Sequence, residues 1–521
     1  RTRLMGHRLQ AHTFPELLGR RFNSRFIQGF SGLIILVFMP LYASAVLIGA
    51  ARFIETTFQI DYDVSVTVFS LIIAGYVVAG GLKGVMYADA LQGTIMFLGM
   101  VILVVFAYGQ LGGVVPAHRE LGALPDRIEQ NYQALEPEIR EAAPATVEDD
   151  ALFGWFAENA TLLGTTKTMT DEEKTAFMAE NPDVAAVGGL MAEHAAPLTN
   201  KLVITGLERG GFRGWTRMPA RGSNMFYVLV TSIIMGVGIG VLAQPQLAVR
   251  FMTVNSSREL HRAVLVGGIF ILAMTGIAFV VGALSNAWFM MPVNGGRVAL
   301  GTVPDRNMDL VIPTFIKTGL PPWFGAVFML TLLSAAMSTL SSQFHAMGTS
   351  IGRDFFEKGM LGSEEHQSTV MITRIGIIVG IVATVLLAYV LPQGIIAAAT
   401  AIFFGLCASA FLPMLVGGLF TRRMTKAAAV SSLCAGFGVS FFWLMFVQQA
   451  KGRLPAMLAS ALLGKDTLLP NPIMGIHWNW VEALFVALPA SAIVAIVVSL
   501  FTQPEPKEHL DHCFKGIRNN R

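Results

Sequence analysis

Residues 322–350 read PWFGAVFMLTLLSAAMSTLSSQFHAMGTS, and these 29 residues contain no Asp, Glu, Lys or Arg. A helix needs about 20 predominantly apolar residues to cross the hydrocarbon core of a bilayer. The stretch therefore predicts a membrane-spanning helix.

Nine further stretches of similar character surround this one. They lie near residues 26–55, 62–81, 87–112, 225–248, 263–289, 369–391, 394–420, 426–448 and 479–502. We expect a tight turn at 80–84 and another at Pro392 and Gly394. The pattern predicts an all-α membrane protein with ten transmembrane helices.

Composition supports the same class of protein. Hydrophobic residues make up 54% of the 521 residues and charged residues only 14%, against about 25% charged in ordinary soluble domains. A net charge of +3 gives no basic footprint for nucleic acid. The sequence has no Gly-x-Ser-x-Gly, P-loop, HExxH or CxxC motif, so we expect a protein that is not an enzyme.

Charges in the loops predict an orientation and four segments. Lys and Arg of the short loops fall on one side of the ten spans, which places both ends of the chain in the cytoplasm of a cell-membrane protein. We expect a cytoplasmic entry loop followed by three transmembrane helices over 1–112, an insert over 113–224, seven transmembrane helices over 225–502 and a cytoplasmic tail over 503–521. Because the first residue is Arg, we expect the chain to begin inside a cytoplasmic loop of a longer protein.

Residues 113–224 differ from the rest of the chain. They contain 17 Asp and Glu against 10 Lys and Arg, and the span count places them outside the cell. Sparse apolar residues at helical spacing favour a small helical insert. A floppy loop fits the composition about equally well.

One face of 322–350 is rich in hydroxyl groups. Positions 334, 338, 341, 342 and 345 share this face. Ala335, Ser338 and Thr339 stand at i, i+3 and i+4, so a carbonyl and two hydroxyls can converge on a small hard cation such as Na⁺. Helix packing through small residues is the alternative, and the stripe alone favours packing.

Two other features are candidates for a transport pathway. Asp89 is a carboxylate near the membrane, where a charge is costly, so it is a functional candidate. The alternative is an interfacial Asp that is stabilised by the helix dipole. The run MGVGIG at 235–240, followed by Gln244 and Pro245, weakens a helix in its middle. Broken helices hold substrates in transporters; close helix packing through a small-residue face is the alternative, and the glycine pattern alone is a weak signal.

The sequence resembles the sodium:solute symporter family. The resemblance rests on TFPE at 13–16, RRF at 20–22, Tyr42 with GAAR at 49–52, GGLKGV at 80–85 with Asp89 and Gln92, QP at 244–245 with RF at 250–251, and AAMSTLS at 335–341. Each match is moderately specific, whereas the ordered set is highly specific.

This resemblance implies a core of two inverted five-helix repeats that couples a small organic solute to Na⁺. The ten spans would be the last ten of thirteen, with a missing N-terminal segment supplying the broken first core helix. The resemblance assigns Ala335, Ser338 and Thr339 to sodium and Asp89 to the ion route. It assigns the substrate cavity to Tyr42, Val237, Gly238 and Gln244.

One departure from the family pattern restricts the range of expected substrates. Proline-transporting relatives carry Trp where this chain has Val237, so a monocarboxylate or pantothenate-like acid is favoured over proline. A transporter-derived sensor is the main alternative function, although only about 19 residues follow the last span.

Overall fold

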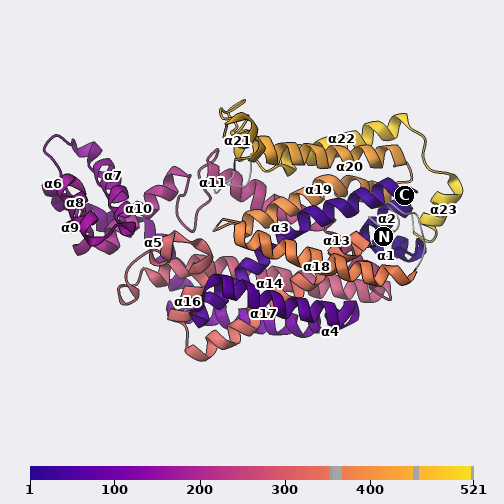
Figure 1. Ribbon diagram of the computed structural model, residues 1–521, viewed down its shortest axis with the longest axis horizontal. Helices are drawn as coiled ribbons and strands as arrows, with labels where there is room; N and C mark the ends of the chain where they lie inside the picture. Colours follow the sequence, from indigo (N-terminus) through magenta and orange to yellow (C-terminus); the bar gives the residue numbers. More distant parts are fainter. Residues whose placement is uncertain (353, 355–365, 393, 450–456, 518–521) are drawn as a thin grey trace. The chain divides into compact units, whose positions relative to one another are not determined.

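The computed structural model describes residues 1–352, 354, 366–392, 394–449 and 457–517 (Figure 1). Across these residues the chain is helical, and its only β interaction is an isolated bridge between Ile473 and Ile476. Contacts divide the chain into two units. The first contains Arg1–Ile102, Phe226–Gly276 and Pro321–Arg521, and the second contains Leu103–Met225 and Ile277–Leu320.

Nine helices in the described ranges are long and apolar enough to cross a membrane. They are Arg25–Phe58, Ala88–Gln110, Asn224–Ala243, Ser257–Phe289, Pro322–Gly352, Met371–Val390, Ile396–Phe420, Lys426–Val447 and Leu484–Phe501. Each coincides with an expected span. The remaining expected span, 62–81, corresponds to the apolar helical segment Tyr62–Val78, which is shorter than the others.

The turn expected at 80–84 is wrong. The backbone is helical from Tyr62 to Gln110, so the second and third expected spans form one helix, α4, of 49 residues. No proline interrupts this segment, and an isolated glycine costs a helix only about 1 kcal/mol. By contrast, Gly394 has a φ of +75° between α18 (His366–Val390) and α19 (Ile396–Phe420), where a turn was expected.

The first unit is built around a layer of packed helices. α3 (Arg25–Phe58) packs against α17 (Pro322–Thr349), α18 and α19, and these helices lie side by side in Figure 1. α20 (Lys426–Phe442) and α22 (Leu484–Phe501) pack together and against α19. The apolar faces of these helices form one continuous core.

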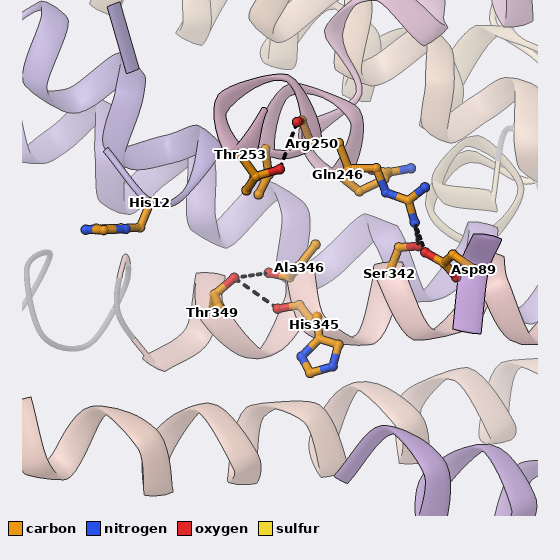
Figure 2. A pocket seen from close by; sticks show the side chains of 10 residues that line it. His12, Asp89, Gln246, Arg250, Thr253, Ser342, His345, Ala346 and Thr349 are labelled. Carbon is orange, nitrogen blue, oxygen red and sulfur yellow. Dashed lines mark hydrogen bonds and ion pairs between the residues drawn. The ribbon is translucent and has the colours of Figure 1, made fainter. Parts of the chain in front are cut away.

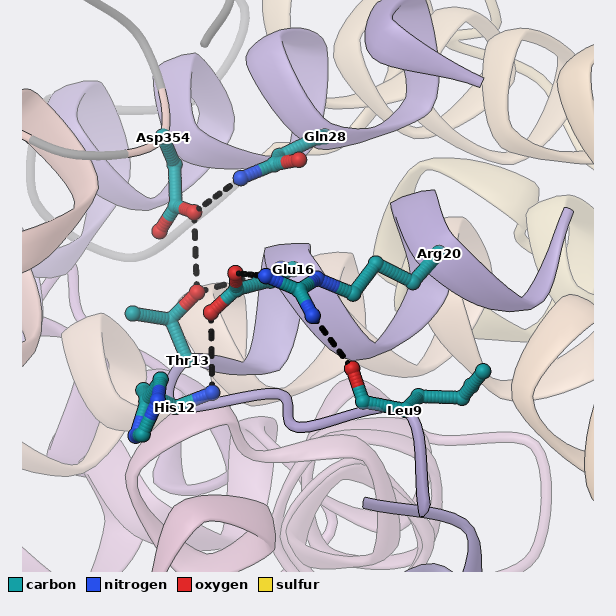
Figure 3. Close-up of polar contacts among 7 residues, drawn as sticks. All are labelled: Leu9, His12, Thr13, Glu16, Arg20, Gln28 and Asp354. Carbon is teal, nitrogen blue, oxygen red and sulfur yellow. Dashed lines mark hydrogen bonds and ion pairs between the residues drawn. The ribbon is translucent and has the colours of Figure 1, made fainter. Parts of the chain in front are cut away.

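The N-terminal TFPE motif has a structural role. Thr13 caps α2 (Phe14–Arg21) by accepting a hydrogen bond from the Glu16 backbone, and its hydroxyl donates to buried Asp354 over 2.8 Å (Figure 3). Glu16 pairs with Arg20 over 2.6 Å, and Gln28 donates to Asp354 over 2.8 Å. The buried carboxylate of Asp354 thus joins the start of α2 to α3, and the buried carboxylate of Glu16 holds α2 itself through Arg20.

The second unit contains the acidic segment and is helical, as expected for an insert. Its helices include α5 (Val114–Gln133), α6 (Glu136–Ala142), α7 (Leu152–Thr165), α8 (Asp171–Glu180), α9 (Pro182–Glu193), α10 (Ala195–Arg209) and α16 (Val311–Gly319). Buried Tyr132, Ile139, Phe156 and Leu198 belong to a separate small core. A segment with its own core is not a floppy loop.

Candidate functional site

The residues proposed to bind sodium lie on the less buried side of α17. Ala335, Ser338 and Thr339 are half-buried, whereas Ala336 and Leu340 on the packed side are fully covered. These three residues are therefore less closely packed against neighbouring helices than Ala336 and Leu340 are. Their neutral oxygens are a donor set that suits Na⁺.

The hydroxyl groups along this stripe differ in how they are used. Those of Ser341 and Ser342 donate back to the carbonyl oxygen of Ser338 over 3.1 and 2.7 Å. The Thr339 hydroxyl has no hydrogen bond within the described part of the chain, and the Ser338 hydroxyl faces the carboxylate of Asp89. Two of the three proposed ligands thus keep a hydroxyl oxygen that is not bound to its own helix.

Asp89 lies beside this stripe, where it forms an ion pair that the sequence did not predict. Its Oδ2 is 2.6 Å from the guanidinium of Arg250 on α13 (Pro245–Thr253), which also donates to Ser342 over 2.8 Å (Figure 2). The Asp89 side chain is 11% exposed and that of Arg250 is 43% exposed. The second carboxylate oxygen, Oδ1, is buried without a hydrogen-bond partner among the described residues.

The position of Asp89 removes one of its two interpretations. It lies in the interior of continuous α4 and not at a helix N-terminus, so a helix dipole does not explain it. Asp89, Arg250, Ser342 and His345 line a pocket of about 110 Å³ (Figure 2). The geometry brings a carboxylate, a cation, a hydroxyl group and an imidazole to one edge of α17.

The helix that contains the glycine run is broken, as the sequence predicts. A π-helical segment, Val228–Val237, passes into α12 (Gly238–Gly240) and a 3₁₀ turn, and the backbone of Gln244 is extended before α13 begins at Pro245. π-Helical segments are rare and are often found at functional sites. Gln244 is buried, and its Nε2 has no partner in the described ranges.

The four substrate-cavity candidates have different surroundings. The Tyr42 ring lies 5.8 and 5.0 Å from the rings of Phe403 and Phe404 on α19. The same Phe404 leaves no room for a side chain at Gly240, because a Cβ there would lie 2.6 Å from its backbone. Gly240, which was not among the four candidates, thus shares the neighbour Phe404 with Tyr42.

Val237 and Gly238 have different surroundings. Val237 is half-buried against the apolar core. Gly238 is exposed, with open space where a side chain would begin.

A buried carboxylate supports the broken helix from behind. Glu482 Oε2 accepts hydrogen bonds from Ser232 Oγ and Gln448 Nε2, each over 2.8 Å, and its backbone N–H donates to Thr231 over 3.0 Å. Its other oxygen has no hydrogen-bond partner among the described residues. The only sequence signal for this residue is a single acidic residue beside an apolar span.

Comparison with known proteins decides the class. The family model described as "Sodium:solute symporter family" matches residues 2–168 and 193–436. The chain belongs to the sodium:solute symporter family. It is accordingly a multi-pass membrane transporter and not an enzyme, with sodium as its coupling ion, as the resemblance implied.

Individual relatives are distant. A sodium/pantothenate symporter from Haemophilus influenzae is 24% identical over 437 residues, covering 84% of this chain and 69% of the relative. A sodium/proline symporter from Staphylococcus aureus is 22% identical over 493 residues, covering 93% of this chain and 74% of the relative.

The fold is also that of a solved symporter. A Na⁺-coupled sialic acid symporter in a substrate-bound outward-open state matches with a TM-score of 0.57 and 16% identity, covering 96% of this chain and 79% of the other. This similarity confirms the expected fold class.

Proposed function

We propose that this symporter carries a small organic acid across the cell membrane together with Na⁺, by alternating access. The half-buried hydroxyl face of α17 beside Asp89 supports this proposal most strongly. Ala335, Ser338 and Thr339 contribute oxygens to the sodium site, and Asp89 attracts the ion along its route. Tyr42, Val237, Gly238 and Gln244 belong to the region that contacts substrate.

Coupling follows from differential binding to two conformations. Sodium binds better to the outward-open state, and binding of both ligands favours closure and release to the cytoplasm. Linkage requires substrate to tighten sodium binding by the same factor as sodium tightens substrate binding. The membrane potential adds about 2.3 kcal/mol per charge per 100 mV when the full field is crossed.

An acid is favoured over proline as the substrate. Among the relatives, one is named for pantothenate and the solved structure for sialic acid, and both compounds are net anions at neutral pH, whereas proline is a zwitterion. Val237 presents a small aliphatic side chain where the proline-transporting pattern has Trp. We therefore favour a monocarboxylate or a pantothenate-like acid.

The proposed orientation places both chain ends in the cytoplasm and residues 113–224 outside. It follows from the distribution of Lys and Arg over the ten expected spans, and it requires 62–81 and 87–112 to cross the membrane separately, although their backbone forms one helix in the structure. Labelling of single introduced cysteines by a membrane-impermeant reagent tests it. Reaction of a cysteine at Thr168 in intact cells supports the proposal, and reaction only after permeabilisation contradicts it.

Uptake into proteoliposomes tests the function. Radiolabelled pantothenate, lactate and proline are offered with an inward sodium gradient and with none. We expect accumulation of an acid above its external concentration only with the gradient. Binding without flux would favour a sensor instead.

A further inference from the structure

A second pocket lies entirely within the second unit. It has a volume of about 700 Å³ and is formed by α7, α10 and residues 297–306. Pockets that hold small molecules commonly measure about 300–1,000 Å³. The space is therefore large enough for a small organic ligand.

The charge lining this pocket is opposite to that of the surrounding insert. Lys167, Arg209, Arg297 and Arg306 line it, against the single acidic side chain of Asp305. The whole second unit has 19 acidic and 13 basic residues over 103–225 and 277–320. Four cations at one pocket are thus concentrated against the overall composition.

These four side chains are also unpaired. No carboxylate oxygen lies within 4.0 Å of any of them in the described part of the chain. Elsewhere in the unit Lys201 pairs with Glu129, and Arg127 and Arg140 also have acidic partners. Unpaired cations around a cavity provide donors for an anion.

The rest of the lining is mostly apolar, with one buried hydroxyl group and a turn of left-handed backbone. Phe153, Leu163 and Met191 contribute apolar surface, which a bare inorganic anion would not use. The Thr205 hydroxyl lines the same pocket and is buried without a hydrogen-bond partner among the described residues. Asp305 and Arg306 have φ values of +50° and +53°, a left-handed conformation that is uncommon for residues other than glycine.

We propose that this pocket is a second binding site, for an organic anion that joins a carboxylate to an apolar body. The guanidinium groups bind the carboxylate, the apolar side chains cover the body, and Thr205 supplies one further polar contact. The choice of a carboxylate rests on the proposed function, because the transported acid is the available ligand of this class. The site is separate from the residues of α17 and does not require sodium.

Equilibrium binding to the full chain in nanodiscs, without sodium, tests this proposal. Radiolabelled pantothenate and hexanoate are compared with their neutral counterparts, panthenol and hexanamide. We expect both acids to bind at least tenfold more tightly than the neutral compounds, and binding to weaken as ionic strength rises. Equal binding of acids and neutral compounds, or no binding of either acid, would overturn the proposal.

Variants locate the site. The double variant Arg209→Gln/Arg297→Gln should lose at least tenfold in affinity for the acids. Arg213→Gln/Arg217→Gln removes the same charge from exposed positions of the unit that do not line the pocket, so it should bind normally. Equal affinity in the two double variants would contradict the assignment.

Two controls keep the test decisive. If Arg209→Gln/Arg297→Gln does not fold, Lys167→Gln/Arg306→Gln replaces it, because both of those side chains are exposed. Ser338→Ala should lose sodium-dependent uptake but keep sodium-free binding of the acids. Absence of sodium-dependent uptake by the unsubstituted protein therefore counts against the transport proposal alone, and absence of its charge-selective binding counts against the pocket alone.

Discussion

At the level of single residues, the sodium proposal depends on two hydroxyl groups that are not occupied by their own helix. A serine or threonine in a membrane helix usually donates to the carbonyl oxygen three or four residues earlier. Ser341, Ser342 and Thr349 do so, whereas no such bond is formed by Thr339 in the described structure. A hydroxyl oxygen that is left available in this way can replace water around an alkali ion.

Ser338→Ala and Thr339→Ala should each raise the sodium concentration needed for half-maximal uptake at least tenfold, because each removes one coordinating oxygen. Folding should be little changed, since neither side chain is fully buried. Thr331→Ala is the matched control, because the Thr331 hydroxyl donates to Val327 of the same helix. Uptake at varied sodium concentration measures the effect, and unchanged sodium dependence in both variants contradicts the assigned site.

Asp89→Asn should slow uptake more mildly than the α17 variants. The substitution removes a charge from the ion route but leaves the proposed ligands of α17 intact. Because Arg250 is 43% exposed, the pair is partly screened and contributes about 1 kcal/mol or less to stability. The expected result is a lower maximal rate in a protein of nearly normal melting temperature.

The double variant Asp89→Asn/Arg250→Gln separates two roles for the pair. If Arg250 serves to neutralise Asp89, removal of both charges should restore part of the rate that Asp89→Asn loses. If the fractional losses of uptake rate in the two single variants multiply in the double variant, the two residues act separately.

At the level of secondary-structure elements, substitutions in the broken helix test whether its glycines serve helix packing or the substrate cavity. Gly240→Ala should destabilise the protein by about 1–3 kcal/mol, because the added carbon would lie 2.6 Å from the Phe404 backbone. Gly238→Ala should fold normally, since a Cβ there would meet nothing within 4 Å. Melting temperatures of the two purified variants measure the difference.

Transport by the stable Gly238→Ala variant then addresses the substrate cavity. If Gly238 contacts the substrate, the variant should show a higher KM for uptake with an unchanged sodium requirement. An unaltered KM would remove Gly238 from the substrate cavity.

Glu482 supports the broken helix through hydrogen bonds. The loss of thermal stability on its replacement should therefore depend on how many of these hydrogen bonds the new side chain keeps. Glu482→Ala leaves the donors of Ser232 and Gln448 without their acceptor, at a cost of about 1–3 kcal/mol for each buried group. Glu482→Gln retains an acceptor and should cost less. Thermal unfolding of both variants checks the order, and equal losses would contradict this role.

The positions of most elements followed from the sequence because the spans are apolar and lack interior charges. The break at Gln244 was also predictable, since Pro245 cannot donate a helical hydrogen bond. The turn at 80–84 was not, because glycine weakens a helix without ending it. Contacts such as Asp89 with Arg250, 161 residues apart, and Ser232 with Glu482, 250 residues apart, depend on tertiary packing that no local pattern encodes.

For the whole molecule, membership of the sodium:solute symporter family provides what the geometry alone does not. The chain contains a face of hydroxyl oxygens on α17, a carboxylate beside it and a broken helix in the same unit. Such parts convert an ion gradient into solute accumulation only when they act in one conformational cycle. Transport against a gradient is therefore the property that distinguishes a symporter from a sensor or a channel.

Net uptake of a radiolabelled organic acid into proteoliposomes that contain none at the start, driven by a sodium gradient, tests this coupling directly. The unsubstituted protein should concentrate the acid inside the vesicles until the sodium gradient collapses, and the Ser338→Ala/Thr339→Ala variant should not. Equal accumulation by both proteins, or accumulation that persists without sodium, would show that the hydroxyl groups of α17 do not couple sodium to the solute.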